Sequence, residues 1–454
     1  MSKIEVNQIS SQCGSTLTIG QSGDTIQLAC GATQTGFGRT GTVNWDTTAK
    51  TASFTAVSGN GYFVNTTSGA ITVTLPASPS AGDIVSISDY AGTAVTNAIT
   101  IARNGSNING GTDNLTINKS NSGITLVYVD GTQGWKGTET SNLNDIETQP
   151  SYIIATGGTE TTCGDYKIHT FTSPGTFEVT SVANPIGGPN NVDYLVVAGG
   201  GAGGRGACNS GAAGGGGGAG GYRESSGTET GCYTASPLGA CVSALPVCAT
   251  SYPITVGAGG TAASLGPYEA DTPAESGNGS NSIFSSITST GGGGGANRSI
   301  PSGEDGASGG SGGGSRINTT AGAGNTPPVT PPQGNPGYSA PPSSAGAGGG
   351  ATAAGGSPTP TTGGNGGNGA TTSISASPTT YGGGGAGGGA SGCVSNGGTG
   401  GTGGGGDGSD DDAANATAGT VNTGGGGGGG GGSSPGSVGK NGGSGIVIIR
   451  YKYQ

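Results

Sequence analysis

The sequence predicts an all-β protein, and three observations lead to that class. Short alternations of polar and apolar residues recur at roughly 8–13 residue intervals, with Gly, Asn, Pro and Ser between them. Glycine is abundant but uneven, because only 25 of the 107 glycines lie in residues 1–190. Between residues 291 and 444 there is no Leu, Phe, Trp or Met, so this stretch cannot bury a conventional core.

We expect three parts: a β-rich segment at residues 1–40, an all-β domain with a linker at 41–150, and a glycine-rich domain with displayed loops at 151–454. In the first part, TLTIG (16–20) and TIQLA (25–29) read as half-buried strands separated by a QSGD turn. Apolar faces this small need a partner chain or a neighbouring rung of the same fold, and we expect partner chains, which predicts a homo-oligomer.

Strands are predicted throughout the second and third parts. In residues 41–150 they lie at 53–57, 61–66, 70–76, 83–90, 97–103, 114–118 and 123–129. In residues 151–454 they lie at 166–171, 175–180, 193–200, 252–257, 282–290 and 445–453. Trp45 and Trp135 flank the first set, and we expect them to close its core or a contact between chains. The alternative role for the two rings is an aromatic platform for sugars.

The glycine runs favour an ordered structure over a flexible linker, which is the usual role of Gly/Ser tracts. The tract is longer than a useful tether, strands bracket it on both sides, and its runs return in blocks of similar length. A polyglycine II helix, the extended backbone with three residues per turn, makes no internal hydrogen bonds. Such helices can pack side by side through their backbones, which only glycine permits. There is no strict Gly-X-Y period, so collagen is excluded.

Charge and composition exclude several classes of function. The chain is acidic, with a net charge of −11, and its 14 basic residues are scattered, which argues against nucleic-acid binding. No apolar stretch is long enough to span a membrane. The first residues lack the apolar core of a secretory signal, so we expect synthesis in a cytoplasm. A reducing compartment disfavours a disulfide among Cys208, Cys232, Cys241 and Cys248. Later oxidation would permit one, so the pairing is left open. Their spacing matches no familiar zinc site.

No catalytic constellation stands out. His169, the one histidine, lies in an alternating strand without a nucleophile motif nearby, and no glycine loop carries a phosphate-binding lysine. The acidic segment Asp407–Asp412 lacks the order of a calcium loop, so we interpret it as a solvated loop and leave a cation site open. We therefore expect a non-enzymatic protein without cofactors.

Several segments taken together resemble the glycine-rich domain of bacteriophage tail-fibre proteins of the marine phage type. They are DYLVVAGGGAGG (193–204), YPITVGAGG (252–260), NGSNSIFSSITSTGGGGGA (278–296), YGGGGAGGGA (381–390) and GGSGIVIIRY (442–451). Residues 54–92, 102–110 and 123–135 likewise resemble β-rich shaft domains of such fibres. The resemblance implies a trimeric virion fibre, extracellular after lysis, that attaches to tail or baseplate proteins through residues 1–40. It also implies polyglycine II helices that form a sandwich, whose loops bind a bacterial surface glycan or outer-membrane protein.

Recognition is expected in the loops, because a rigid scaffold displays binding groups there. The candidate segments are Tyr222–Tyr252, Arg298–Asp305, Arg316–Tyr338 and Asp407–Asp412. Tyrosines can stack on a sugar ring and arginines can fork onto a carboxylate or phosphate, which selects Tyr233, Arg298, Arg316, Tyr338 and Tyr381. The alternatives are tyrosines that cap the glycine runs and arginines that are merely solvated. Rival functions are a purely structural or decorating fibre and, more remotely, an ice-binding protein.

Overall fold

The computed structural model describes residues 43–140, 146–148, 150–206, 212–227, 233–239, 242–263, 276–297, 304–340, 345–390, 396–411, 413–432 and 437–454. The chain divides into two compact units, residues 1–149 and 150–454. Within the described ranges, regular structure is β apart from one 3₁₀ turn, η2 (Pro237–Gly239), which confirms the all-β class. No helix in these ranges is long and apolar enough to cross a membrane. The segment predicted at 1–40, with its strands at 16–20 and 25–29, lies outside the described residues.

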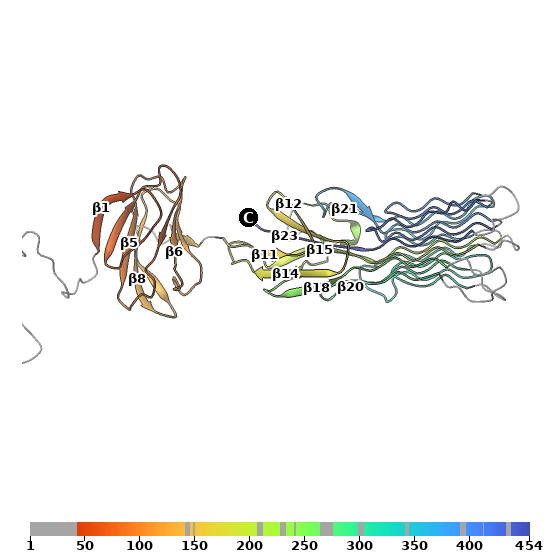
Figure 1. Ribbon diagram of the computed structural model, residues 1–454, viewed down its shortest axis with the longest axis horizontal. Helices are drawn as coiled ribbons and strands as arrows, with labels where there is room; N and C mark the ends of the chain where they lie inside the picture. Colours follow the sequence, from red (N-terminus) through yellow and green to blue (C-terminus); the bar gives the residue numbers. More distant parts are fainter. Residues whose placement is uncertain are drawn as a thin grey trace, which may run out of the picture. The chain divides into compact units, whose positions relative to one another are not determined.

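Unit 1 contains two five-stranded sheets (Figure 1). One has the order β1 (Asn44–Lys50), β3 (Asn60–Val64), β5 (Ile84–Asp89), β8 (Gly123–Asp130) and β9 (Gly134–Thr140). The other has the order β10 (Ile146–Thr148), β7 (Leu115–Ile117), β6 (Ile99–Ala102), β4 (Ile71–Thr74) and β2 (Phe54–Thr55). The chain alternates between the sheets from β1 to β6, so these strands pair in parallel within each sheet, and neither sheet closes into a barrel.

The core of unit 1 comes from the inward-facing residues of both sheets. Val64, Val85 and Leu126 from the first sheet and Val73 and Ile101 from the second are all fully buried. The core therefore comes from strands that the alternation in the sequence predicted. The two tryptophans differ in exposure. Trp135 is fully buried beside Tyr128, whereas Trp45 is 43% exposed and stacks on Phe63 with 4.8 Å between ring centroids.

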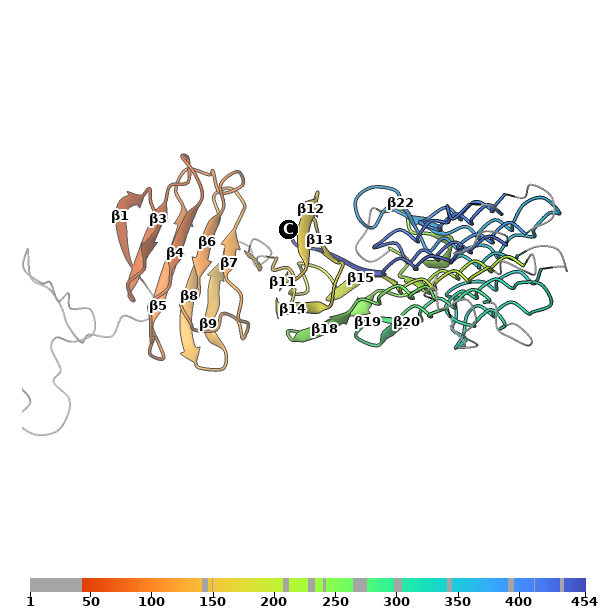
Figure 2. The same ribbon diagram turned by 45° about the vertical axis from the view of Figure 1, so that its right-hand side comes forward.

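Unit 2 begins with two antiparallel sheets (Figure 2). One has the order β11 (Ile154–Thr156), β14 (Gly175–Ser181), β18 (Ser251–Thr255), β19 (Ser282–Phe284) and β20 (Ile287–Ser289). The other has the order β12 (Thr159–Cys163), β13 (Tyr166–Phe171), β23 (Ile446–Lys452), β15 (Asn191–Val197) and β16 (Tyr222–Glu224), and β17 (Leu245–Pro246) also pairs with β15. A separate hairpin joins β21 (Ala370–Thr372) to β22 (Thr379–Tyr381).

Strand β23 ties the end of the chain to the start of unit 2, because it pairs with β13 on one side and β15 on the other. Its two faces enter different cores. Val447, Ile449 and Tyr451 join the cluster between the sheets, and Ile446 and Ile448 join the cluster beneath β21 and β22. One prediction was wrong here: residues 282–290 form two strands instead of one. Ser285 has a φ of 53°, which turns the chain between β19 and β20.

The glycine-rich segments leave the sheets as extended runs that lie side by side (Figures 1 and 2). The run at residues 214–221 shows how they are joined. Its successive N–H groups donate to three neighbouring runs in turn, so every third N–H group donates to the same run. The first neighbour accepts from Gly214, Gly217 and Gly220 through the carbonyls of Gly430, Gly427 and Gly424. The second accepts from Gly215, Gly218 and Gly221 through Ala296, Gly293 and Thr290, and the third accepts from Gly216 and Ala219 through Gly346 and Gly349. Its carbonyls accept from three further runs, at 198–206, 309–316 and 382–390.

This pattern identifies the polyglycine II arrangement. A helix with three residues per turn points successive peptide groups in three directions, and it has no internal hydrogen bonds to compete with bonds between runs. The run at 214–221 therefore has six hydrogen-bonded neighbours. We call this packed set of runs the glycine lattice. It satisfies the buried backbone groups that a segment without a side-chain core would otherwise leave unpaired.

Close approach of backbones explains the glycine content. A Cβ built on Gly428 would overlap the carbonyl oxygen of Asp407, and one on Gly427 would overlap that of Lys440, in each case well inside 3.0 Å. The same is true at Gly217, which faces the carbonyl of Gly201. The runs at 198–206, 214–221, 382–390 and 424–432 contain only glycine and alanine, apart from Arg205.

Side chains take the place of a neighbour where a run lies at the lattice surface. In each case two residues three positions apart accept hydrogen bonds from backbone N–H groups that are also three positions apart: Asn365 and Asn368 from Thr399 and Thr402; Asp407 and Asp410 from Gly400 and Gly397; Asn278 and Asn281 from Gly294 and Gly291. The donor–acceptor distances are 2.8–3.3 Å. The repeat of three matches the period of the helix, so these polar residues cap the edges of the lattice.

Candidate recognition surface

The lattice has a proximal end at the sheets and a distal end away from them (Figure 1). Hydrogen bonds join the runs at the distal end. Arg205 N donates to Asn297 Oδ1 (2.6 Å), Ser315 N donates to Tyr338 O (3.1 Å), and Gly389 N donates to Ser409 O (2.8 Å). Described runs end here at residues 206, 263, 297, 340, 390 and 432, so the connecting segments begin here.

The structure divides the predicted recognition segments between the two ends. The described residues of Tyr222–Tyr252 start in β16 and lie at the proximal end. Arg316–Tyr338 starts at the distal end, reaches the proximal end where Gln333 O accepts from Tyr222 N (2.8 Å), and returns. Glu304, Asp305 and Asp407–Asp411 lie toward the distal end, whereas 298–303 and Asp412 lie outside the described residues.

Tyr233 and Tyr381 belong to the proximal core. Tyr381 is 5% exposed and packs in the cluster formed by β15, β16 and β23, and Tyr233 packs against that cluster. The Tyr233 hydroxyl donates to Ser225 O (3.3 Å), and burial raises the pKa of this phenol. Burial also raises the pKa of Tyr381. The location of both rings supports the packing alternative over a role in receptor binding.

Arg316 and Tyr338 lie together at the distal end, as neighbours of the hydrogen-bonded Ser315. Arg316 is 8% exposed, so it is not a solvated arginine, and Tyr338 is half-buried. Arg298 lies outside the described residues. Of the five predicted contact residues, Arg316 and Tyr338 are therefore the pair whose backbones the structure places near each other at the distal end.

The acidic segment contributes to the lattice. Besides capping Gly397, Asp410 accepts a hydrogen bond from Asn415 Nδ2 (2.7 Å), and Asp407 caps Gly400 (2.8 Å). Among the residues that the structure describes, no three His, Cys, Asp or Glu side chains lie close enough to hold a metal ion. Edge capping accounts for the placement of Asp407 and Asp410 in this segment.

A buried polar cluster in unit 2 was not predicted from the sequence. Glu224 is 2% exposed and accepts hydrogen bonds from Tyr222 Oη (2.7 Å) and Ser236 N (3.0 Å). Burial raises the pKa of its carboxyl. Asp193, fully buried, accepts from Ser225 Oγ (2.6 Å), so both acids fix the segment after β16 to the sheet. The one available signal was the acid inside the apolar strand DYLVV.

Two further titratable residues flank this cluster. The guanidinium of Arg450 is buried and lies over the rings of Tyr166 and Tyr233, 4.7 and 5.5 Å from their centroids. His169 is fully buried on the other face of the sheet. Its Nδ1 donates to Gly157 O (2.7 Å), and its Nε2 accepts from Tyr451 Oη (3.0 Å). Both nitrogens are thus engaged by groups that position the ring, which assigns His169 a packing role.

Two cysteine thiols are free in the described residues, on Cys163 and Cys248. Cys248 is exposed and lies 3.5 Å from Tyr252 Oη. Cys208, Cys232 and Cys241, the other members of the group for which a disulfide was left open, lie outside the described residues.

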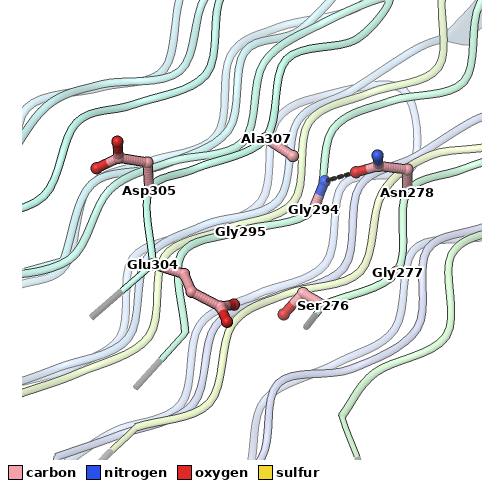
Figure 3. A pocket seen from close by; sticks show the side chains of 8 residues that line it. All are labelled: Ser276, Gly277, Asn278, Gly294, Gly295, Glu304, Asp305 and Ala307. Carbon is pink, nitrogen blue, oxygen red and sulfur yellow. Dashed lines mark hydrogen bonds between the residues drawn. The ribbon is translucent and has the colours of Figure 1, made fainter. Parts of the chain in front are cut away.

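A pocket of about 260 Å³ opens on the side of the lattice toward the distal end (Figure 3). Its floor is the backbone of Gly277, Gly294 and Gly295. Its walls carry the side chains of Ser276, Asn278, Glu304, Asp305 and Ala307. The Glu304 side chain extends toward Ser276 across the opening, whereas the Asp305 carboxylate points away from it (Figure 3). Two of these residues, Glu304 and Asp305, belong to a predicted recognition segment.

An antiparallel β frame that anchors a lattice of glycine helices defines the class of protein: a glycine-rich scaffold. A family model described as a glycine-rich domain matches residues 172–452, more than half of the chain. The chain belongs to this family. The match begins in the loop before β14 and ends with β23, so it covers most of the frame and the entire lattice. No curated protein matches the chain.

Proposed function

We propose that the chain is a phage tail-fibre adhesin that binds a bacterial surface receptor without catalysis. The resemblance to tail fibres noted in the glycine series, which ends in GSGIVIIRY, supports the virion assignment. In this proposal residues 1–40 attach the fibre to tail or baseplate proteins, and the glycine-rich domain faces the host. The assembly is a homotrimer, which sedimentation measures directly; a stable monomer of 42.5 kDa would exclude it.

The observation that carries the adhesin proposal is the glycine lattice, whose described runs end together at the distal end. Each run is hydrogen-bonded to several neighbouring runs, because its successive N–H groups point in three directions. The distal end therefore has a defined geometry. Binding groups on loops gain affinity when a rigid scaffold positions them beforehand. Arg316 and Tyr338 lie at this end.

A purely structural or decorating fibre is the second candidate, and one observation favours it. Many polar side chains of the lattice surface cap backbone N–H groups, as Asn365, Asn368 and Asp407 do. Side chains used in this way hold the scaffold together without contacting another molecule. A structural role would require nothing more from them.

Adsorption of the purified full-length protein to candidate host cells separates the two. The adhesin proposal expects saturable binding to some bacterial strains and none to others. Substitution of Tyr338 and Arg316 by Ala, with folding checked by circular dichroism, should weaken adsorption. Absence of saturable binding to any strain that the phage infects would favour the structural fibre.

A further inference from the structure

An aromatic patch on unit 1, beside the edge strand β1, carries an inference about how the chain begins. We propose that residues 16–29 pair with the free edge of β1 in the same chain and cover this patch. The inference goes beyond the adhesin proposal and does not depend on it. The proposed attachment to tail or baseplate proteins then falls to residues 1–15.

The patch consists of Trp45 and Phe63. Their rings stack with 4.8 Å between centroids, and 43% of Trp45 is exposed. Trp45 lies opposite Gly61 of β3, and a Cβ added to Gly61 would come within 2.7 Å of the indole. Because glycine has no Cβ, the indole can lie against the sheet at this point. The exposed part of Trp45 is therefore an apolar surface held in a fixed position.

Strand β1 has its apolar side on the outer face of the sheet. Tyr62 of β3 faces the core and is buried, whereas Trp45 lies on the other side of the sheet with Gly61. Asp46, which lies opposite Tyr62, forms an ion pair with Lys50 (2.7 Å). Polar groups therefore close β1 on the core side, and the outer side is the one that needs an apolar cover.

Strand β1 also has a free edge (Figure 2). It pairs with β3 on one side, and no described strand lies on its other side. An edge strand presents backbone N–H and C=O groups with which a further strand can pair. A strand added here would bring every second side chain next to Trp45, because side chains alternate between the two faces of a sheet.

Residues 16–29 have the composition that this position requires. The two strands predicted there lie outside the described residues, and each places two large apolar residues on one side: Leu17 with Ile19, and Ile26 with Leu28. The one charged residue of the segment is Asp24, in the turn between the strands. The segment therefore offers an apolar, uncharged side to Trp45, the first exposed large apolar residue of the described chain.

The connection to β1 is long enough to permit the pairing. Residues 30–42 comprise 13 residues, which span roughly 43 Å when extended, whereas the seven residues of β1 rise about 23 Å. The segment can therefore run along β1 in either direction. A short tether also holds it at an effective concentration on the order of millimolar, which favours the chain's own segment over a second copy as the cover.

Tryptophan fluorescence of the full-length protein tests the inference. The chain has two tryptophans and Trp135 is fully buried, so quenching by acrylamide reports the exposure of Trp45. The test variant is Leu28→Asp, which places a charge on the apolar side of the predicted strand. The matched control is Gln27→Asp, which introduces the same residue on the opposite side. Circular dichroism checks folding, and Leu28→Ser carries the same expectation if Leu28→Asp disturbs it.

We expect little quenching in the wild type and in Gln27→Asp, because the segment covers the indole in both. In Leu28→Asp the emission of one of the two tryptophans should become quenchable. Addition of Trp45→Phe to this variant should remove the quenchable emission, which identifies its source.

Four results would overturn the inference. Strong quenching in the wild type would mean that nothing covers Trp45. Unchanged quenching in the Leu28 variants, or equal quenching in Leu28→Asp and Gln27→Asp, would mean that the apolar side of residues 16–29 is not the cover. Protection that disappears on dilution to the monomer would assign the cover to a second copy of the chain. The adhesin proposal is unaffected by each of these results, since no cell or receptor enters the measurement.

Discussion

His169 shows how a single residue acquires its role from its surroundings. The sequence identified it as the one histidine and placed it in an alternating strand. The structure adds that its ring stacks on Tyr451, with 5.5 Å between centroids, and meets the edge of Phe177 at 5.1 Å. Burial lowers the pKa of the imidazole, because a charged ring would lose its hydration. The neutral ring is the form that the folded state selects.

This lowered pKa predicts a pH dependence of stability. The unfolded chain binds a proton at His169 with the ordinary pKa of 6.5, whereas the folded chain binds it only at lower pH. His169 should therefore cost unit 2 no stability above pH 6.5. As the pH falls below 6.5, the free energy of unfolding should decrease, by about 1.4 kcal/mol for each unit between the unfolded and folded pKa of His169. In His169→Phe the contribution of this residue to the slope should disappear. Urea unfolding across pH 4.5–7.5 measures it, and equal slopes in both proteins would contradict the assignment.

The candidate site was only partly predictable at this scale. The sequence indicated tyrosines and arginines between glycine runs as candidates, and the backbones of Arg316 and Tyr338 do lie near each other at the distal end. Nothing local in the sequence distinguishes them from Tyr233 and Tyr381, which the frame buries in its core. The pocket also escaped prediction, because its lining residues Ser276, Gly294 and Glu304 come from three runs whose adjacency depends on the lattice.

At the scale of elements, the strands were the most predictable part. The strand expected at 166–171 coincides with β13, and the expected 445–453 contains β23, because alternation of apolar residues marks a sheet with two packed faces. Short or polar strands were missed, among them β12 (TETTC) and β21 (ATT), because neither contains an alternation of large apolar residues. The order in which the strands pair, with β23 between β13 and β15, could not be predicted, because no local sequence pattern marks which strands become neighbours.

The edge caps supply a prediction about single elements of the lattice. Asp407→Ala removes the acceptor for Gly400 N (2.8 Å) and should reduce the free energy of unfolding of unit 2 by about 1 kcal/mol. Asp407→Asn keeps an acceptor oxygen and should cost much less. Thermal and urea unfolding of the two variants, side by side, give the difference. Equal stability of both variants would show that the cap contributes nothing.

At the scale of the whole molecule, we expect the glycine lattice to fold as a unit. Ordering a backbone residue costs about 1–2 kcal/mol, and a hydrogen bond returns about 0.5–1.5 kcal/mol, so an isolated run gains nothing by ordering. Order becomes favourable when each run has many neighbours and the ends are fixed by strands such as β15 and β23. The sequence suggested this cooperation through its bracketing strands and repeated blocks, but the neighbours of each run emerge only in three dimensions.

Substitution inside the lattice should therefore affect all of unit 2. Gly428→Val places side-chain atoms on the carbonyl oxygen of Asp407, which belongs to a neighbouring run and cannot move alone. We expect the variant to lose the folded glycine-rich unit, seen as loss of its cooperative unfolding transition. Gly131→Ala is the control, since nothing lies within 4 Å of a Cβ there. A Gly428→Val protein that unfolds like the wild type would refute close packing at this run.

Hydrogen exchange of the backbone amides tests the ordered lattice most directly. The amides of residues 382–390 and 424–432 donate to carbonyls of neighbouring runs, for example Gly385 to Gly217 and Gly427 to Gly201. The structure predicts that these amides exchange far more slowly than those of an unfolded chain, with protection lost together when unit 2 unfolds. Exchange at random-coil rates in both runs, with the strands β13 and β23 still protected, would show that the glycine segments are linkers and would contradict the lattice.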